Sequence, residues 1–219
     1  MPRIKVVVFD FDGVLVDSEN MKRRALKDNF LEFGEEFAQK VFEYQETTGS
    51  NRYDVADYAA YKLGKDQEFA NRYADKYTKT VKEKIIAMSN VPSCESTLSL
   101  LVKKYPLYIS SGTPTDDLKE ILVAKTMRHL FKEIYGSPSP KIDHFVEIMA
   151  REKISNPEEI LFIGDMEEDF SVAQSFDLDF LAINYRGDKN KVTEVDRLFD
   201  IVGYLKKNED MHTKFRYQN

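Results

Sequence analysis

Short runs of consecutive apolar residues recur along most of the chain. They lie at residues 5–9, where Lys5 precedes four apolar residues, and at 107–109, 134–135, 160–163 and 180–183. Segments with helical periodicity separate them. Apolar runs without polar alternation are typical of strands that are buried on both faces of a parallel sheet. Their alternation with helical segments predicts an α/β fold, in which a parallel sheet is flanked by crossover helices.

Residues 17–90 have a different pattern, because they contain no strand-like run and their apolar residues recur at helical spacing. These positions are Phe30, Phe33, Phe37, Val41, Tyr44, Tyr58, Tyr61, Leu63, Phe69, Tyr73 and Tyr77. We interpret the last three as part of an apolar core. The pattern predicts an all-α domain at residues 17–90, inserted into a core domain of residues 1–16 and 91–219. The first core helix is expected at residues 96–104, with Ser96 near its N-terminus.

Composition narrows the class of protein. The 219 residues are 42% hydrophobic and 32% charged, which is typical of a folded chain with a sizeable core. The net charge of −6 argues against a surface that binds nucleic acid or a membrane. No apolar run approaches the roughly 20 residues of a membrane-spanning helix, and the N-terminus does not resemble a signal peptide, so we expect a cytoplasmic protein. The single cysteine, Cys94, is interpreted as inert.

Polar side chains follow the expected strands at the point where each strand ends. They belong to Asp10, Asp12, Ser110, Ser111, Asp165 and Asp169. In an open parallel sheet, ligands bind outside the carboxyl ends of the strands. We therefore expect carboxylates and hydroxyls from distant parts of the chain to meet at one edge of the sheet.

The carboxylates are the most informative of these groups. Asp10 directly ends a buried strand, where a charge is costly without a partner, and Gly13 permits a tight turn after Asp12. Asp165 and Asp169 lie four residues apart at a helix start and can face the same way. An acidic helix N-terminus is also favoured by the helix dipole alone. Carboxylates crowded together would repel one another, so the set predicts a Mg²⁺ site.

Two further segments suit a phosphate group. Ser110, Ser111 and Gly112 precede a helix expected near Thr115, where hydroxyl and backbone N–H groups can bind phosphate oxygens, although helix capping explains them equally well. Lys141 precedes a helix expected at residues 142–153. A cation at a helix start is electrostatically disfavoured, so Lys141 either contacts an anion or is an ordinary solvated lysine.

These residues, in this order, resemble the haloacid dehalogenase (HAD) superfamily. The sequence Asp-Phe-Asp-Gly-Val-Leu-Val-Asp-Ser at residues 10–18 is similar to the first family motif, and Gly-Asp-x-x-x-Asp at 164–169 to the fourth. Ser110 and Lys141 resemble the second and third. The insert at residues 17–90 resembles the C1 helical cap. The resemblance covers the whole chain and implies a Rossmann-like HAD core with this cap, similar to phosphoglycolate phosphatase and β-phosphoglucomutase-like members.

The third motif departs from the usual pattern. Many relatives with a cap have Lys-Pro-x-Pro-Asp, where this chain has Ser137-Pro-Ser-Pro-Lys141. The lysine therefore lies four residues downstream of its usual position, as it does in other branches of the superfamily.

The resemblance implies a reaction. Asp10 would attack phosphorus, and Asp12 would protonate the leaving oxygen and then deprotonate a water molecule. Ser110 and Lys141 would bind the phosphoryl oxygens, with Ser111 and Gly112 beside the substrate. The implied function is that of a phosphatase acting on a small phosphorylated metabolite, as a monomer or homodimer.

The resemblance also implies the ligands of Mg²⁺. They would be the carboxylate of Asp10, the backbone carbonyl of Asp12 and the carboxylate of Asp165, with Asp169 binding directly or through water.

The inserted domain carries one candidate residue of its own. Residues 48–54 resemble the Gly-x-x-Arg substrate loop found in caps of this superfamily, so Arg52 is expected to bind a carboxylate or a second phosphate on the substrate. An ordinary loop arginine is nearly as good an interpretation.

Two other functions stay open. A phosphosugar mutase of the β-phosphoglucomutase type is one, although Lys22 stands where that enzyme's cap histidine is expected. A non-catalytic protein that binds a phosphorylated ligand on the same scaffold is the other. The acid at Asp12 favours phosphate esters over carbon–halogen or carbon–phosphorus bonds.

Overall fold

The computed structural model describes residues 3–216, and the chain divides into two compact units. The first unit, here called the sheet unit, comprises Met1–Asp17 and Ser89–Asn219. The second, the helical unit, comprises Ser18–Met88. The expected domain boundaries, residues 17–90, lie within two residues of these.

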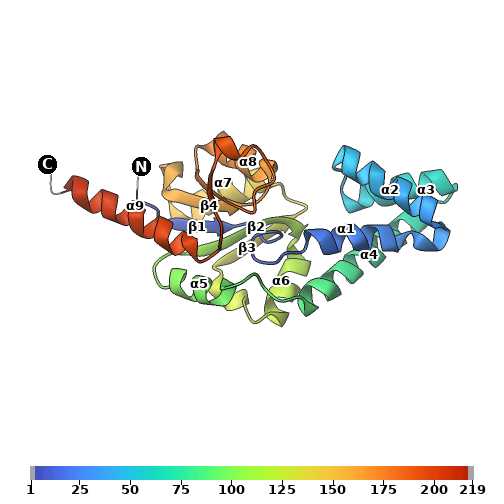
Figure 1. Ribbon diagram of the computed structural model, residues 1–219, viewed down its shortest axis with the longest axis horizontal. Helices are drawn as coiled ribbons and strands as arrows, with labels where there is room; N and C mark the ends of the chain where they lie inside the picture. The colour runs from blue at the N-terminus through green and yellow to red at the C-terminus, as the bar shows by residue number, and fades with distance from the viewer. Residues whose placement is uncertain (1–2, 217–219) are drawn as a thin grey trace. The chain divides into compact units, whose positions relative to one another are not determined.

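The sheet unit contains one parallel six-stranded sheet (Figure 1). Its strands are β1 (Val6–Phe9), β2 (Leu107–Pro114), β3 (Glu133–Ser137), β4 (Ile160–Gly164), β5 (Asp179–Ile183) and β6 (Thr193–Val195). All five expected runs form strands in parallel pairing, so the α/β fold is confirmed. The sixth strand, at the sheet edge beside β5, was not expected.

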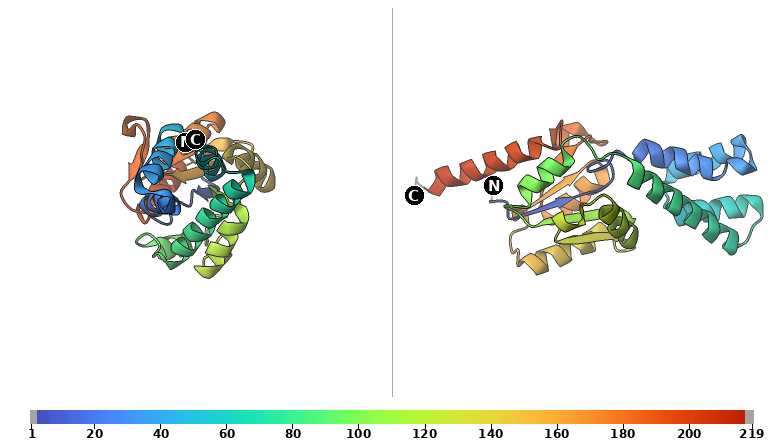
Figure 2. Two further views of the ribbon diagram at one scale, coloured as in Figure 1. Left: turned by 90° about the vertical axis from the view of Figure 1, so that its right-hand side faces the viewer. Right: turned by 90° about the horizontal axis from the view of Figure 1, so that it is seen from below.

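Helices cover both faces of this sheet. They are α5 (Cys94–Leu101), α6 (Thr115–Ala124), α7 (Lys141–Glu152), α8 (Glu167–Phe176) and α9 (Asp200–Arg216). Figure 1 shows α7 and α8 on one face and α5 and α6 on the other, and α9 packs against α5 (Figure 2). On the α7 and α8 face, Phe145 and Ile148 pack against Val8, Tyr108 and Phe162, and all five side chains are buried.

The strand order places a crevice at the centre of the sheet. The order is β3-β2-β1-β4-β5-β6, so the direction of winding reverses between β1 and β4. Crevices outside the carboxyl ends of the strands at such a reversal are the usual ligand sites of open α/β sheets. The segments that follow β1 and β4, which contain Asp10 and Asp165, therefore lie side by side.

Among the boundaries that differ from expectation are the starts of α5 and α7 and the end of β2. α5 begins at Cys94 rather than Ser96, because Ser93 takes a left-handed conformation (φ 63°) and its carbonyl accepts a hydrogen bond from the Ser96 hydroxyl. β2 continues through residues 110–114, which were expected to be a loop, because irregular pairing with β3 extends as far as Pro114 and Ser137. α7 begins at Lys141 itself.

The helical unit consists of α1 (Glu19–Asn29), α2 (Glu35–Thr48), α3 (Arg52–Leu63) and α4 (Gln67–Ala87), with a short 3-10 helix at Leu31–Phe33. Polar caps start two of them. The Asn51 side chain accepts hydrogen bonds from the backbone of Tyr53 and Asp54 at the start of α3, and Asp66 caps α4. Gly49 and Gly64 end α2 and α3 in left-handed conformations.

The aromatic pattern of residues 17–90 forms the core of this helical unit. Phe69 and Tyr73 are buried and stack at a centroid distance of 4.3 Å, and Tyr77 packs against the same cluster. Tyr61 is an exception, because 79% of its surface is exposed. The buried residues of α3 are Val55, Ala56, Ala59 and Ala60, and Tyr61 lies outside the face that they define.

Among residues 3–216, no helix combines the length and apolar character that crossing a bilayer requires.

Candidate active site

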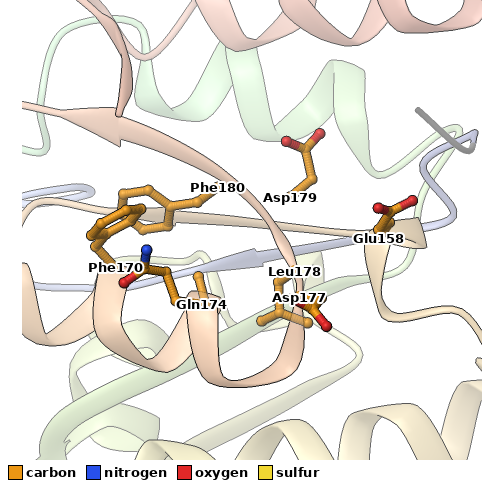
Figure 3. A pocket seen from close by; sticks show the side chains of 8 residues that line it. Glu158, Phe170, Gln174, Asp177, Leu178, Asp179 and Phe180 are labelled. Carbon is orange, nitrogen blue, oxygen red and sulfur yellow. The ribbon is translucent and has the colours of Figure 1, made fainter. Parts of the chain in front are cut away.

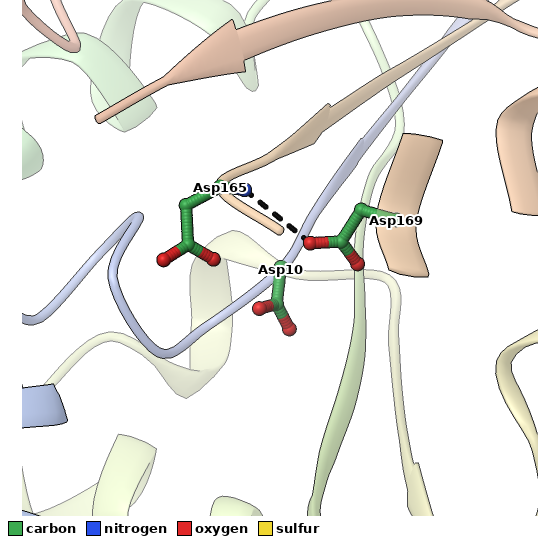
Figure 4. A group of neighbouring side chains, drawn as sticks. All are labelled: Asp10, Asp165 and Asp169. Carbon is green, nitrogen blue, oxygen red and sulfur yellow. Dashed lines mark hydrogen bonds between the residues drawn. The ribbon is translucent and has the colours of Figure 1, made fainter. Parts of the chain in front are cut away.

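Asp10 stands where β1 ends, and its carboxylate is almost completely buried. Its backbone N–H donates to the carbonyl of Ile163, which extends the pairing with β4 by one residue. Only 5% of Asp10 is exposed, and its Oδ1 lies 3.4 Å from Nζ of Lys141. Asp165 and Asp169 converge on the same point (Figure 4). A carboxylate therefore ends the central strand among charged partners.

The turn after β1 places Asp12 and Gly13 against other strands. The Gly13 N–H donates to the carbonyl of Val16 at 2.7 Å, and its φ of +77° is one that glycine adopts easily. A Cβ at this position would lie 2.0 Å from Oδ2 of Asp165. Across the sheet, the hydroxyl of Thr113 donates to Oδ2 of Asp12 at 2.7 Å. The turn thus leaves room for Asp165 and fixes one oxygen of Asp12.

Asp165 and Asp169 begin the segment that follows β4. Oδ2 of Asp169 accepts hydrogen bonds from the backbone N–H groups of Asp165 (3.3 Å) and Met166 (3.2 Å). Its other oxygen, Oδ1, forms a buried ion pair with Lys141. Nε of Arg186 lies 3.7 Å from Oδ2 of Asp165, and the Arg186 N–H donates to the Asp165 carbonyl. Both oxygens of Asp169 are therefore engaged by donors.

Burial and charge govern the protonation of this cluster. Burial raises the pKa of Asp10 well above its usual value, Lys141 opposes that shift, and Asp169, Asp12 and Asp165 add to it. Burial also disfavours the charged form of Lys141, but the carboxylates of Asp10 and Asp169 outweigh this and raise the pKa of the lysine. The lysine is held as a cation, and the remaining carboxylate charge calls for another positive group.

The donor set fits a hard divalent cation. One carboxylate oxygen each from Asp10, Asp165 and Asp169 lie within 4.8 Å of one another, and all three residues are buried. Oδ1 of Asp10 accepts no hydrogen bond from any residue that the structure describes. Sets of oxygen ligands without nitrogen or sulfur suit Mg²⁺, which completes its octahedron with water and substrate oxygens.

The expected phosphate-binding residues take different positions. Ser110 is buried, and its Oγ lies 2.9 Å from Nδ1 of His144. Oγ of Ser111 accepts a hydrogen bond from the backbone N–H of Thr113 at 3.2 Å, within β2 itself. Gly112 is exposed. The side chain of Ser110 thus contacts α7, the helix that also carries Lys141.

Arg52 belongs to the helical unit, where it is the first residue of α3. Its Nη1 donates to the hydroxyl of Thr78 at 3.1 Å. The side chain lines a cavity of about 150 Å³ together with Lys22, Arg23 and Glu46. Arg23 forms an ion pair with Glu46 at 2.5 Å, and Glu19 is a second acidic residue of the lining. Three cationic residues and two acidic ones therefore line this small cavity.

Sequence reasoning missed three residues around the carboxylates: Thr113, His144 and Arg186. Thr113 lies in a segment that was expected to be a loop, and pairing within the sheet turns its side chain toward Asp12. His144 is three residues after Lys141, so the two residues share one face of α7. This spacing is visible in the sequence and could have singled out His144. Arg186 follows the carboxyl end of β5, the same kind of position that singled out Asp10.

A larger cavity of the sheet unit, of about 370 Å³, lies between α8 and β5 (Figure 3). Phe170 and Phe180 form its apolar part and Glu158 and Asp179 its acidic part. The hydroxyl of Tyr204 donates a hydrogen bond shared by the two carboxylate oxygens of Asp179, each 2.9 Å from the hydroxyl oxygen. None of the carboxylates that converge on Asp10 lines this cavity.

Solved structures share the fold over more than nine-tenths of the chain. A predicted phosphoglycolate phosphatase from Haemophilus somnus is 21% identical with a TM-score of 0.72, and the match covers 93% of this chain and 99% of that one. A β-phosphoglucomutase from Clostridium difficile is 16% identical, also with a TM-score of 0.72, and the match covers 96% and 99%. A magnesium-bound HAD hydrolase from Bacillus subtilis is 19% identical with a TM-score of 0.68, covering 94% and 100%.

Sequence comparison identifies the family. No curated protein matches the chain significantly. The family model described as haloacid dehalogenase-like hydrolase matches residues 7–183, which include Asp10, Ser110, Lys141 and Asp169. This match spans most of the chain, and the strand order and the carboxylate cluster agree with the resemblance that the motifs carry. The chain belongs to the haloacid dehalogenase-like hydrolase family.

Proposed function

We propose that this protein is a Mg²⁺-dependent phosphatase that hydrolyses a small phosphate monoester through an aspartyl-phosphate on Asp10. The observation that carries the proposal is the surroundings of the Asp10 carboxylate at the end of β1. Lys141 lies 3.4 Å from Oδ1 of Asp10, and Asp165 and Asp169 bring further oxygen atoms within 4.8 Å. Asp12 stands two residues further on as a second acid.

In the first step, an oxygen of Asp10 attacks phosphorus and the bond from phosphorus to the ester oxygen breaks. Asp12 gives its proton to the departing oxygen, so the product leaves as an alcohol. The ammonium group of Lys141 faces Asp10 and stabilises negative charge on the phosphoryl oxygens as the new bond forms.

In the second step, Asp12 accepts a proton from water, whose oxygen attacks the same phosphorus. The bond between phosphorus and Asp10 breaks, inorganic phosphate leaves, and Asp10 returns to its carboxylate form. The hydroxyl of Thr113 donates to Oδ2 of Asp12 and so orients the carboxyl group that exchanges the proton. One residue therefore serves as acid and then as base.

Asp10, Asp165 and the backbone carbonyl of Asp12 would hold Mg²⁺, which supplies positive charge opposite the phosphoryl oxygens. Asp169 is proposed to contact the metal through water, because both of its oxygens already have donors. The direct task of Asp169 is to hold Lys141. The lysine thus serves the site although it lies four residues downstream of its position in many relatives.

The substrate is proposed to carry a second anionic group. Arg52 lines the small cavity of the helical unit with Lys22 and Arg23, and guanidinium groups bind carboxylate and phosphate bidentately. The fold is shared with a predicted phosphoglycolate phosphatase and a β-phosphoglucomutase, whose names indicate anionic or phosphorylated substrates. A phosphorylated carboxylic acid or a bisphosphate is therefore the first class to test.

The test is phosphate release from p-nitrophenyl phosphate and a panel of metabolite monoesters, with Mg²⁺ and then with EDTA. We expect release that depends on the metal, with the highest kcat/KM for esters that carry a second anion. The Asp10→Asn variant keeps the side-chain volume and is expected to release no phosphate while remaining folded. Transfer of phosphate between positions of a sugar without release would indicate a mutase, and binding without either reaction a non-catalytic role.

A further inference from the structure

His144 and Lys141 lie on the same face of α7, one helical turn apart. Lys141 contacts Asp10 and Asp169, and Nδ1 of His144 lies 2.9 Å from Oγ of Ser110. His144 is 2% exposed and Ser110 is completely buried. A single turn of helix thus carries Lys141 and contacts Ser110, the two residues that the family resemblance assigns to the phosphoryl oxygens.

The ring of His144 is held on its other side as well. It stacks on Tyr135 of β3, with a centroid distance of 5.4 Å and an interplanar angle of 24°. Nε2 is buried and makes no hydrogen bond with any of the residues that the structure describes. Burial lowers the pKa of His144. The backbone carbonyls of Gly136 and Ser139 favour the protonated ring and raise the pKa, but burial has the larger effect. The ring is therefore neutral near pH 7 and carries one hydrogen.

The position of that hydrogen decides what Ser110 can do. A serine hydroxyl has one hydrogen to donate and two lone pairs that accept. If Nδ1 of His144 accepted the hydrogen, Ser110 would have none left for a phosphoryl oxygen. If Nδ1–H donates to Oγ instead, the serine hydrogen stays free for the substrate. In the second arrangement Nε2 carries no hydrogen and is an acceptor.

We propose that His144 is a positioning residue, whose Nδ1–H donates to Ser110 and directs the serine hydrogen to a phosphoryl oxygen of the substrate. This inference rests on the proposed function, because it concerns Ser110 as a phosphoryl ligand. It assigns His144 no direct contact with the substrate. It also gives α7 a second task, since the same helix turn holds the cation and orients the hydroxyl.

The first test is a double-mutant cycle between His144 and Ser110, measured as kcat/KM with p-nitrophenyl phosphate. His144→Phe is expected to lower kcat/KM about ten-fold, the loss of one oriented hydrogen bond. In the Ser110→Ala background the same change is expected to have no further effect, because the hydroxyl that it orients is gone. His144→Asn, which can place an amide N–H near the Nδ1 position, should retain most of the activity, and His144→Gln should not.

The matched control is His129→Asn, which changes an exposed histidine of the same unit and should leave kcat/KM unchanged. Thermal unfolding of each variant separates loss of orientation from loss of folding. Equal losses from His144→Phe with and without Ser110 would overturn the proposal, because they would mean that His144 acts through packing alone.

The second test does not depend on turnover. The ¹⁵N chemical shifts of the ring nitrogens distinguish the two neutral tautomers, and the chain has only 3 histidines, so the His144 signals can be assigned from the spectrum of His144→Asn. We expect Nδ1 to carry the hydrogen. A neutral ring protonated on Nε2 would overturn the inference even in an active enzyme. A wild-type protein without phosphatase activity would refute the proposed function, whereas the tautomer would still report on the contact between His144 and Ser110.

Discussion

The hydroxyl of Thr113 donates a hydrogen bond of 2.7 Å to Oδ2 of Asp12. The two residues are 101 positions apart in the chain, and only the pairing of β1 with β2 brings them together. Asp12 is the proposed acid and base. Because Oδ2 accepts the hydrogen bond from Thr113, it is a weaker acceptor for the proton that Asp12 transfers. The sheet therefore orients the group that must exchange a proton twice in each turnover.

Replacement of Thr113 by valine, which keeps the shape and removes the hydroxyl, should lower kcat about ten-fold, because Asp12 loses the bond that orients it. Thr113→Ser keeps the hydroxyl and should stay near the wild-type rate. Steady-state kinetics with a substrate that has a poor leaving group will show the effect best. Equal rates for the valine and serine variants would mean that the hydrogen bond does not support proton transfer.

Gly13→Ala should damage both folding and activity. The new Cβ would lie 2.0 Å from Oδ2 of Asp165, and alanine is strained at a φ of +77°. Gly64→Ala is the matched control, because Gly64 also has a positive φ (63°) and nothing lies within 4 Å of its Cβ position. Backbone strain alone should cost the control about 1–2 kcal/mol of unfolding free energy and leave kcat unchanged.

The two glycine variants are compared by chemical denaturation and by Mg²⁺ titration. Both have backbone strain, so any difference between them reports the clash of the new Cβ with Asp165. We expect Gly13→Ala to be the less stable of the two and to bind Mg²⁺ more weakly. Equal stability and equal metal affinity would show that Asp165 can move away without consequence.

Lys141→Met should abolish most of the activity, with a loss of at least about 100-fold in kcat, because the proposed transition state loses its buried cation. The same variant should bind Mg²⁺ more tightly than the wild type, since Lys141 repels the metal and forms ion pairs with Asp10, a proposed ligand, and with Asp169. Lys119→Met, at an exposed position of α6, is the control for loss of a lysine. Activity near that of the control would remove Lys141 from the mechanism.

Cys94 should not react with a thiol reagent while the protein is folded. Its side chain is 2% exposed, and burial raises its pKa to about 12, so the thiolate is scarce at pH 8. Titration with 5,5′-dithiobis(2-nitrobenzoic acid) is expected to show no reaction in buffer and one thiol per chain in denaturant. Rapid reaction in buffer would mean that the start of α5 opens easily.

The apolar runs predicted the five longer strands because each run holds buried residues of the sheet, and β1 and β4 are buried along their whole length. The 3-residue strand β6 could not be predicted, because its sequence Thr-Glu-Val is short, carries a charge and lies at the sheet edge. The start of α5 was placed two residues late, because Ser96 matches the usual capping residues and the unusual conformation of Ser93 leaves no sequence signal.

The carboxylates of the candidate site could be singled out from the sequence because they directly follow buried strands. The contact of Thr113 with Asp12 could not be predicted, because it depends on how β2 continues past residue 109. The spacing of three residues from Lys141 does place His144 on the same helix face, but its contact with Ser110 is visible only in the structure. For Lys141 the sequence allows either a contact with an anion or a solvated side chain. The structure places it at the first position of α7, with Nζ 3.4 Å from Oδ1 of Asp10.

The central claim is that phosphate passes through Asp10, and the most direct measurement is a burst experiment with Asp12→Asn and p-nitrophenyl phosphate. p-Nitrophenolate leaves without protonation, so the first step should proceed, whereas hydrolysis of the aspartyl-phosphate should stall without its base. We predict a rapid release of one equivalent of p-nitrophenolate per chain, followed by slow turnover, with the phosphoryl group recovered on the peptide that contains Asp10. Steady release without a burst, or a phosphoryl group on another residue, would contradict the mechanism.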